Sequence, residues 1–127
     1  MQYPEDFMIC MMTLQSIEEM LRYAIGGQKL KISKLVEESH GVYYKPNTKH
    51  LLKRTFGQLA NEFHELCDDQ GLVDRLKGMV SIRNEFAHSL LTNDRWHEQS
   101  LKHQSDIIKL RDDLTIYIDS RIFPKPK

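Results

Sequence analysis

The sequence has little of several features that would assign a protein to a class at once. It contains only two cysteines, Cys10 and Cys67, in 127 residues. Their surroundings match no metal-ligand spacing, which favours reduced thiols, although a disulfide between the two stays open. No apolar run approaches the roughly 18 residues of a membrane span, and acidic Glu5 and Asp6 stand where a signal peptide is basic. We therefore expect a cytoplasmic protein with no membrane segment, metal or cofactor.

A net charge is also absent, because 18 basic residues balance 18 acidic ones. The two signs are nevertheless separated along the chain. Residues 29–54 are rich in lysine, whereas residues 61–74 contain acidic residues and no lysine or arginine. A basic segment can bind a polyanion locally even when the whole chain is neutral, although a solvated surface gives the same pattern. The residues that we predict to contact RNA are Lys45, Lys49, Lys53 and Arg54.

The pattern that is present is helical, because apolar residues recur every three or four positions through most of the chain. Residues 7–24 predict a first helix that begins at Pro4 and is stopped by Gly26–Gly27. A short helix over residues 32–38 is then expected inside an irregular segment that reaches residue 46. Asn47 or Thr48 is expected to cap the following helix.

Three further helices are predicted in the second half of the chain. The first carries apolar residues from Leu51 to Leu66 and ends near Gly71, and the next spans residues 72–91. Residues 92–94 break the chain and offer caps for a last long helix. Two apolar faces fit that last helix equally well, both with Ile118 and Ile122. One face contains Leu101, Ile108 and Leu114, and the other contains Ile107 and Leu110.

These patterns predict one all-α domain over residues 1–127, an up-and-down bundle of four to five helices. At this length a single hydrophobic core is expected. Neither the alternation of a β-strand nor an internal repeat is apparent.

The segment 83–88 departs from an ordinary core helix. Its sequence is Arg83-Asn84-Glu85-Phe86-Ala87-His88. The surrounding helix has an apolar stripe, and Arg83 interrupts this stripe. A guanidinium keeps its charge, so it is tolerated there only beside a partner or in a polar cleft. The stripe comprises Leu72, Leu76, Val80, Ala87 and Leu91.

The chemistry of these side chains fits RNA cleavage without a metal. Histidine has the pKa for proton transfer, and the arginine fork matches two phosphate oxygens. We expect His88 to transfer the proton and Arg83 to stabilise the phosphate. Asn84 would orient the imidazole or hydrogen-bond the phosphate. Five residues along a helix turn by about 140°, so Arg83 and His88 do not face the same way. A two-fold dimer that joins two such helices in one cleft resolves this difficulty.

A purely structural interpretation competes with this one. Arg83 would then pair with an acidic residue, and His88 would meet the last carbonyls of its helix. Elsewhere, His97 and His103 are spaced poorly for a shared metal and are expected on the surface.

The motif Arg83-Asn84-x-x-Ala87-His88, late on a long helix of a small all-α domain, resembles the HEPN superfamily. Thr55 to Leu59 on the preceding helix also looks like some members. The resemblance implies a dimeric helical bundle and a metal-independent endoribonuclease of toxin or defence systems, with an antitoxin or regulatory protein as a further partner. The alternative that it allows is a catalytically inactive module that binds a partner protein or a nucleotide in regulation. A DNA-binding regulator is less favoured, because the basic segment lacks helix-turn-helix spacing.

Overall fold

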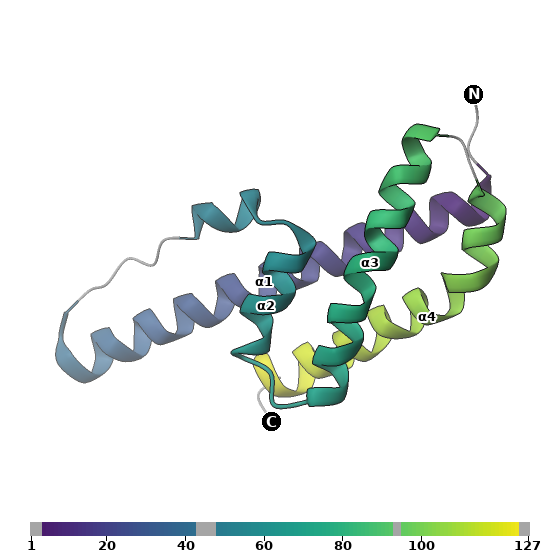
Figure 1. Cartoon of the computed structure of the whole chain (residues 1–127). Coiled ribbons are helices and arrows are strands. Elements are labelled where there is room, and N and C mark those ends of the chain that lie inside the picture. The colour runs from purple at the N-terminus through teal and green to yellow at the C-terminus, as the bar shows by residue number, and fades with distance from the viewer. Residues whose placement is uncertain (1–3, 43–47, 93–94, 125–127) are drawn as a thin grey trace.

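The computed structural model of the chain describes residues 4–42, 48–92 and 95–124, and of Leu91 only the backbone. Within these residues the chain forms an all-α bundle of four helices without a strand, as predicted (Figure 1). Two short helical turns accompany them. In chain order the elements are α1 (Glu5–His40), η1 (Lys49–Lys53), α2 (Phe56–His64), α3 (Gln70–Thr92), α4 (Trp96–Tyr117) and η2 (Ile118–Ile122).

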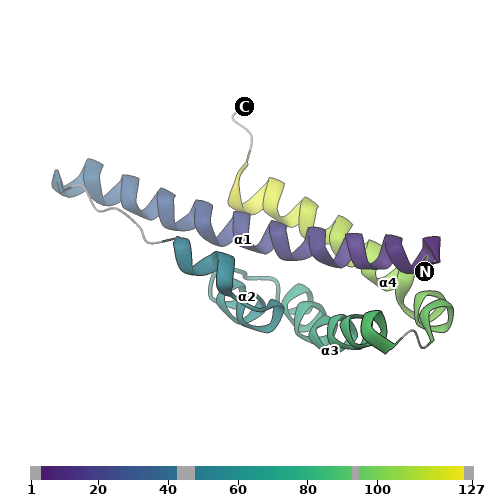
Figure 2. The same cartoon turned by 90° about the horizontal axis from the view of Figure 1, so that it is seen from above.

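Two of the three long helices, α1 and α4, run in the same direction, and α3 runs in the opposite one. The start of α1 meets the start of α4, where the rings of Phe7 and Trp96 have centroids 5.4 Å apart. Further along α1, Tyr23 contacts Phe123 just after η2, so α1 and α4 run in parallel. Helix α3 runs in the opposite direction to both, and its late residue Phe86 stacks on Phe7 at 5.5 Å (Figure 2). Helix α2 is short, so the chain reaches α3 without another full crossing of the bundle.

The prediction that Gly26–Gly27 ends the first helix is wrong, because α1 continues through both glycines. A helix-interior glycine costs up to about 1 kcal/mol relative to alanine, and packing can outweigh that cost. The ring of Phe123 occupies the space in which a Cβ of residue 27 would lie. Helix α1 ends instead at Gly41, whose φ of 68° is left-handed and whose N–H donates to the carbonyl of Glu37. The predicted short helix over residues 32–38 is therefore part of α1.

The predicted helix from Leu51 to Leu66 is also divided. Residues 49–53 form η1, and Arg54 then adopts an extended conformation before α2 begins. Thr55 caps α2, because its hydroxyl accepts from the N–H of Gln58 while the Gln58 side chain accepts from the N–H of Thr55. This capping box sets the start of α2. Thr48 precedes η1 but makes no side-chain capping hydrogen bond, and Asn47 lies outside the described residues.

The second half of the chain follows the prediction more closely. Helix α3 covers the predicted range, and the side chain of Asp69 accepts from the N–H of Leu72 at its start. In α4 the buried face contains Ile107 and Leu110 together with Leu114 from the other predicted face, whereas Leu101 is 70% exposed. The core lies between α1, α3 and α4 with α2 across one end. Its largest fully buried side chains include Phe7, Ile17, Leu21, Phe63, Leu76, Phe86 and Leu110.

Candidate functional site

Helix α3 presents the predicted site residues on two different sides. Arg83 is partly buried toward α1, whereas Asn84 and His88 are exposed. Phe86 between them is fully buried and anchors this part of α3 to the core. Because Phe86 holds the helix in one rotation, the directions in which Arg83 and His88 point are set by the core.

Arg83 has an acidic partner. Its Nε donates to Oε1 of Glu18 on α1 at 3.0 Å. Glu18 is 9% exposed, and its other oxygen lies 3.6 Å from a terminal nitrogen of Arg22. The ion pair explains how a cation is tolerated in the apolar stripe of α3, as the structural interpretation expects. It engages only Nε of Arg83 among the described contacts, and the side chain stays 39% exposed.

Arg83 and Asn84 line a hollow with two further arginines, Arg22 and Arg54, which we call the arginine hollow. Its volume is about 380 Å³, and Glu18 is its only acidic lining residue among those described. The hollow joins one predicted RNA-binding residue, Arg54, to two predicted catalytic residues. A cluster of guanidinium groups around a concave surface is suited to a phosphate, because each fork can bind two phosphate oxygens.

Arg22 organises this hollow, although nothing in the sequence pattern singled it out. Its Nε donates to the carbonyl of Leu51 at 2.9 Å, and one terminal nitrogen donates to the carbonyl of Arg54 at 3.2 Å. The second terminal nitrogen pairs with Glu19. Arg22 thereby ties α1 to the extended segment before α2. Its spacing from Glu18 by one helical turn was the available signal.

Arg54 is held on its other side by an acidic residue of α2. A terminal nitrogen of Arg54 lies 3.3 Å from Oε1 of Glu62. The Nε of Arg54 is buried, and no hydrogen-bond partner is found for it within the described residues. Of the other predicted RNA-binding residues, Lys49 and Lys53 lie on the exposed side of η1, and Lys45 lies outside the described residues.

His88 lies in a second, polar pocket of about 280 Å³ between the end of α3 and the start of α4. Arg83 is not among the residues that line this pocket, and His88 is not among those that line the arginine hollow. This separation agrees with the angle of about 140° that five residues span on a helix. The two side chains of one protomer therefore line different cavities. The pocket of His88 is also lined by Glu85, Ser89, Arg95, Lys102 and His103.

His103 in this pocket was expected on the surface, and that prediction is wrong. The residue is only 9% exposed, because its ring packs edge-on against Phe86 in the core. Its Nε2 lies 3.6 Å from Oε2 of Glu85 and has no hydrogen-bond partner among the described residues. His97 is exposed as expected and contacts Asp6 at 2.7 Å.

A groove rich in methionine adjoins Arg83 on the other side. It has a volume of about 350 Å³ and lies between the start of α1 and the late part of α3. Met12 in this groove is 65% exposed, and Met8 and Leu90 are exposed as well. Methionine is suited to adaptable contacts, so the groove is an apolar surface directly beside the predicted catalytic arginine.

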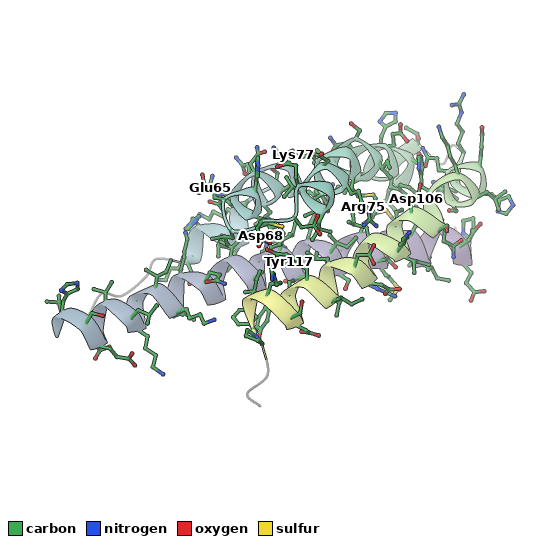
Figure 3. All side chains as sticks on the ribbon, turned by 90° about the horizontal axis from the view of Figure 1, so that it is seen from below. Glu65, Asp68, Arg75, Lys77, Asp106 and Tyr117 are labelled. Carbon is green, nitrogen blue, oxygen red and sulfur yellow. The ribbon has the colours of Figure 1, made fainter. Side chains whose placement is uncertain are left out.

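A polar cluster at the opposite end of α3 stabilises the fold. The Tyr117 hydroxyl donates to Oδ1 of Asp68 at 2.8 Å and accepts from the N–H of Asp68, and Figure 3 shows the two side chains side by side. Arg121 pairs with the other oxygen of the carboxylate. The hydrogen bond from Tyr117 and the charge of Arg121 lower the pKa of Asp68. Burial raises the pKa of Tyr117 to about 12, helped by the hydrogen bond to the Asp68 carboxylate and by Cys67 and opposed by the hydrogen bond from the N–H of Asp68.

Both cysteines are free thiols in this fold. Cys10 is buried, and burial raises the pKa of its thiol. Cys67 is half-buried next to the polar cluster. Within the described ranges no group of three or more histidine, cysteine, aspartate or glutamate side chains is arranged to hold a metal ion. None of the described helices combines the length and apolar character required to cross a membrane.

Comparison of the chain with protein-family models, with curated proteins and with solved structures finds no match.

Proposed function

We propose that this protein is a cytoplasmic, metal-independent endoribonuclease of the toxin or defence type that acts as a homodimer. One observation carries the proposal. Arg54, Arg83 and Asn84, selected from two separate parts of the sequence, line the same hollow together with Arg22. In this proposal Arg22 holds the hollow together, and Arg54 and Arg83 bind the RNA backbone.

The proposed reaction is transesterification within the RNA. The 2′-oxygen attacks the neighbouring phosphorus, and the bond from phosphorus to the 5′-oxygen breaks. His88 moves the proton that leaves the 2′-hydroxyl or the proton that the 5′-oxygen gains, and water supplies the complementary transfer. The terminal nitrogens of Arg83, which Glu18 does not engage among the described contacts, stabilise the charged phosphorane. The products carry a 2′,3′-cyclic phosphate and a 5′-hydroxyl.

The dimer in this proposal supplies the imidazole that the hollow lacks. The methionine groove lies beside Arg83, so a second copy docked there brings another α3 close to the arginine hollow. In a two-fold arrangement the His88 of each copy then serves the hollow of the other.

The test combines two inactive variants. Wild-type protein should cleave RNA in EDTA, and Arg83→Ala and His88→Ala alone should each lose this cleavage. A mixture of the two variants, refolded together, contains mixed dimers in which one cleft keeps both residues. With random pairing the mixture should regain about a quarter of the wild-type activity.

Each result of this experiment has a definite meaning. Wild-type protein that never cleaves RNA in EDTA overturns the enzyme proposal. Cleavage by the wild type with no recovery in the mixture keeps the enzyme but places Arg83 and His88 of one copy in the same site. Subunit exchange in the mixture is verified with differently tagged chains.

The ion pair of Arg83 with Glu18 favours a second candidate, a catalytically inactive HEPN-type module. Such a module would use the arginine hollow to bind a nucleotide or an acidic surface of an antitoxin or other regulatory protein. Binding of a nucleoside monophosphate that Arg54→Ala and Arg83→Ala both weaken, in a protein that does not cleave RNA, would support it.

A further inference from the structure

Helix α1 extends well past the rest of the bundle. Its last thirteen residues, 28–40, which we call the arm, protrude to one side in both views (Figures 1 and 2). Leu30, Ile32 and Leu35 of the arm are all more than half exposed. The arm continues a helix whose first part is packed in the bundle, and its exposed apolar side chains offer a surface for a partner.

Two of these residues, Ile32 and Leu35, continue the core-facing stripe of α1, whereas Leu30 lies on the opposite side of the helix. Leu21 and Ile25 are buried against the bundle. The same spacing of three and four residues leads on to Ile32 and Leu35, which are 54% and 58% exposed. The stripe that packs on the bundle in the first part of α1 therefore runs on where no described element covers it.

The charges beside this stripe indicate which partner covers the apolar surface of the arm. Lys31 and Glu38 are seven residues apart, so they flank the same edge of the stripe, one on each side of Leu35. In an antiparallel pair of arms, Lys31 of each copy lies next to Glu38 of the other, which creates two opposite-charge contacts. A parallel pair would instead place Lys31 opposite Val36 of the other copy, so neither charge contact would form. The arm is therefore complementary to itself.

We propose that the arm is an interface that docks antiparallel against the arm of a second copy of this chain. Ile32 of one arm packs on Leu35 of the other, and the contact has two-fold symmetry. This contact lies away from the methionine groove and does not depend on the proposed cleavage of RNA. If both contacts form, dimers joined through the groove associate further through their arms.

A charge-reversal experiment tests this pairing. Lys31→Glu and Glu38→Lys each turn two attractive contacts into repulsive ones, and each should raise the dissociation constant of the arm contact about tenfold. An equimolar mixture of the two variants should associate as tightly as the wild type, because opposite charges face each other again. The dissociation constants come from the concentration dependence of the mean mass in sedimentation equilibrium.

Matched controls lie on the outer face of the same arm. Lys34→Glu and Glu37→Lys make the same charge changes on the side of the helix away from the stripe, so they should leave the mass unchanged. Lys31 also donates to the carbonyl of Ile122 in its own chain. The Glu38→Lys variant and the mixture keep the test independent of the loss of that contact.

Leu35→Asp provides a second test, which does not depend on the charge contacts between Lys31 and Glu38. Leu35 is exposed in the single chain, so the variant should keep the helical spectrum and melting temperature of the isolated protomer while losing arm association. The proposal is overturned if Leu35→Asp has the wild-type mass, or if the mixture of charge variants does not recover. Weaker RNA binding by Lys31→Glu without any change in mass would likewise overturn it in favour of an RNA contact.

Discussion

Arg83 has two roles at the level of the single residue, because the group proposed to bind phosphate also neutralises Glu18. If Arg83 is removed, Arg22 still faces the Glu18 carboxylate at 3.6 Å. We therefore expect Arg83→Ala to lower the free energy of unfolding by only about 1 kcal/mol, less than the roughly 3–5 kcal/mol for a buried charge left without a partner, because Arg22 remains beside Glu18. Its RNA cleavage should fall by orders of magnitude, since a transition-state contact is lost.

Arg83→Lys is the matched control for this prediction. It keeps the charge beside Glu18 but loses the planar fork, so it should retain stability and still cleave poorly. Urea denaturation and cleavage in EDTA measure the two properties. A large loss of stability in Arg83→Ala, together with a wild type that does not cut RNA, would assign Arg83 to structure alone.

Tyr117 links the stability of the fold to pH in two directions. The lowered pKa of Asp68 means that its contribution is present above the ordinary value of 3.8 and is lost as the pH falls through the folded-state pKa. Tyr117 has its pKa raised from 10.0 to about 12, so its contribution is present below pH 10 and is lost between those two values. The wild type should thus lose stability at both extremes.

Tyr117→Phe should remove most of both effects. The variant should be less stable at pH 7, depend less on pH in acid and lack the loss between pH 10 and about 12. Midpoints of urea unfolding at pH 3, 7 and 11 measure this. Tyr23→Phe, at an exposed tyrosine, is the control and should keep the wild-type profile. An unchanged alkaline profile in Tyr117→Phe would contradict the assignment.

At the scale of the element, the packing of α1 predicts opposite effects on stability when two adjacent glycines are replaced by alanine. A Cβ at residue 26 would lie 3.5 Å from the Leu51 side chain, an ordinary contact, so Gly26→Ala should raise stability by about 0.5–1 kcal/mol. A Cβ at residue 27 would overlap the ring of Phe123, so Gly27→Ala should displace that ring and lower stability.

Thermal unfolding of the two glycine variants measures the difference. Gly78→Ala is the control for helix propensity alone, because its Cβ would meet nothing within 4 Å on the exposed side of α3. Gly26→Ala and Gly78→Ala should both raise the melting temperature. Stabilisation by Gly27→Ala would mean that Phe123 does not pack on α1 as described.

For the whole molecule, the basic segment predicts a salt-dependent affinity for RNA. Reversing Lys45, Lys49 and Lys53 to glutamate should weaken RNA binding. It should also reduce the slope of log K against log salt by about 0.7 for each lost phosphate contact with a single strand. Lys109→Glu on the exposed side of α4 is the control and should leave the slope unchanged. An unaltered slope in the triple variant would assign these lysines to a solvated surface.

The sequence by itself determined the helical class, the extent of α3 and the unusual character of Arg83. These follow from local properties: the 3.6-residue period of apolar side chains and the cost of placing a permanent charge in an apolar stripe. The start of α2 is also encoded locally, by the capping box of Thr55 and Gln58. The apolar residues Leu51 and Leu52 nevertheless favoured a helix that begins earlier.

Only the tertiary structure decided the rest, because it depends on contacts between distant segments. Phe123 packs on Gly27 and lets α1 continue, although glycines alone predict an end. Glu18 meets Arg83 across 65 residues, and Arg22 meets the carbonyl of Arg54 across 32. No spacing along the chain encodes such pairs. The arginine hollow therefore became visible only once α1, α2 and α3 were packed together.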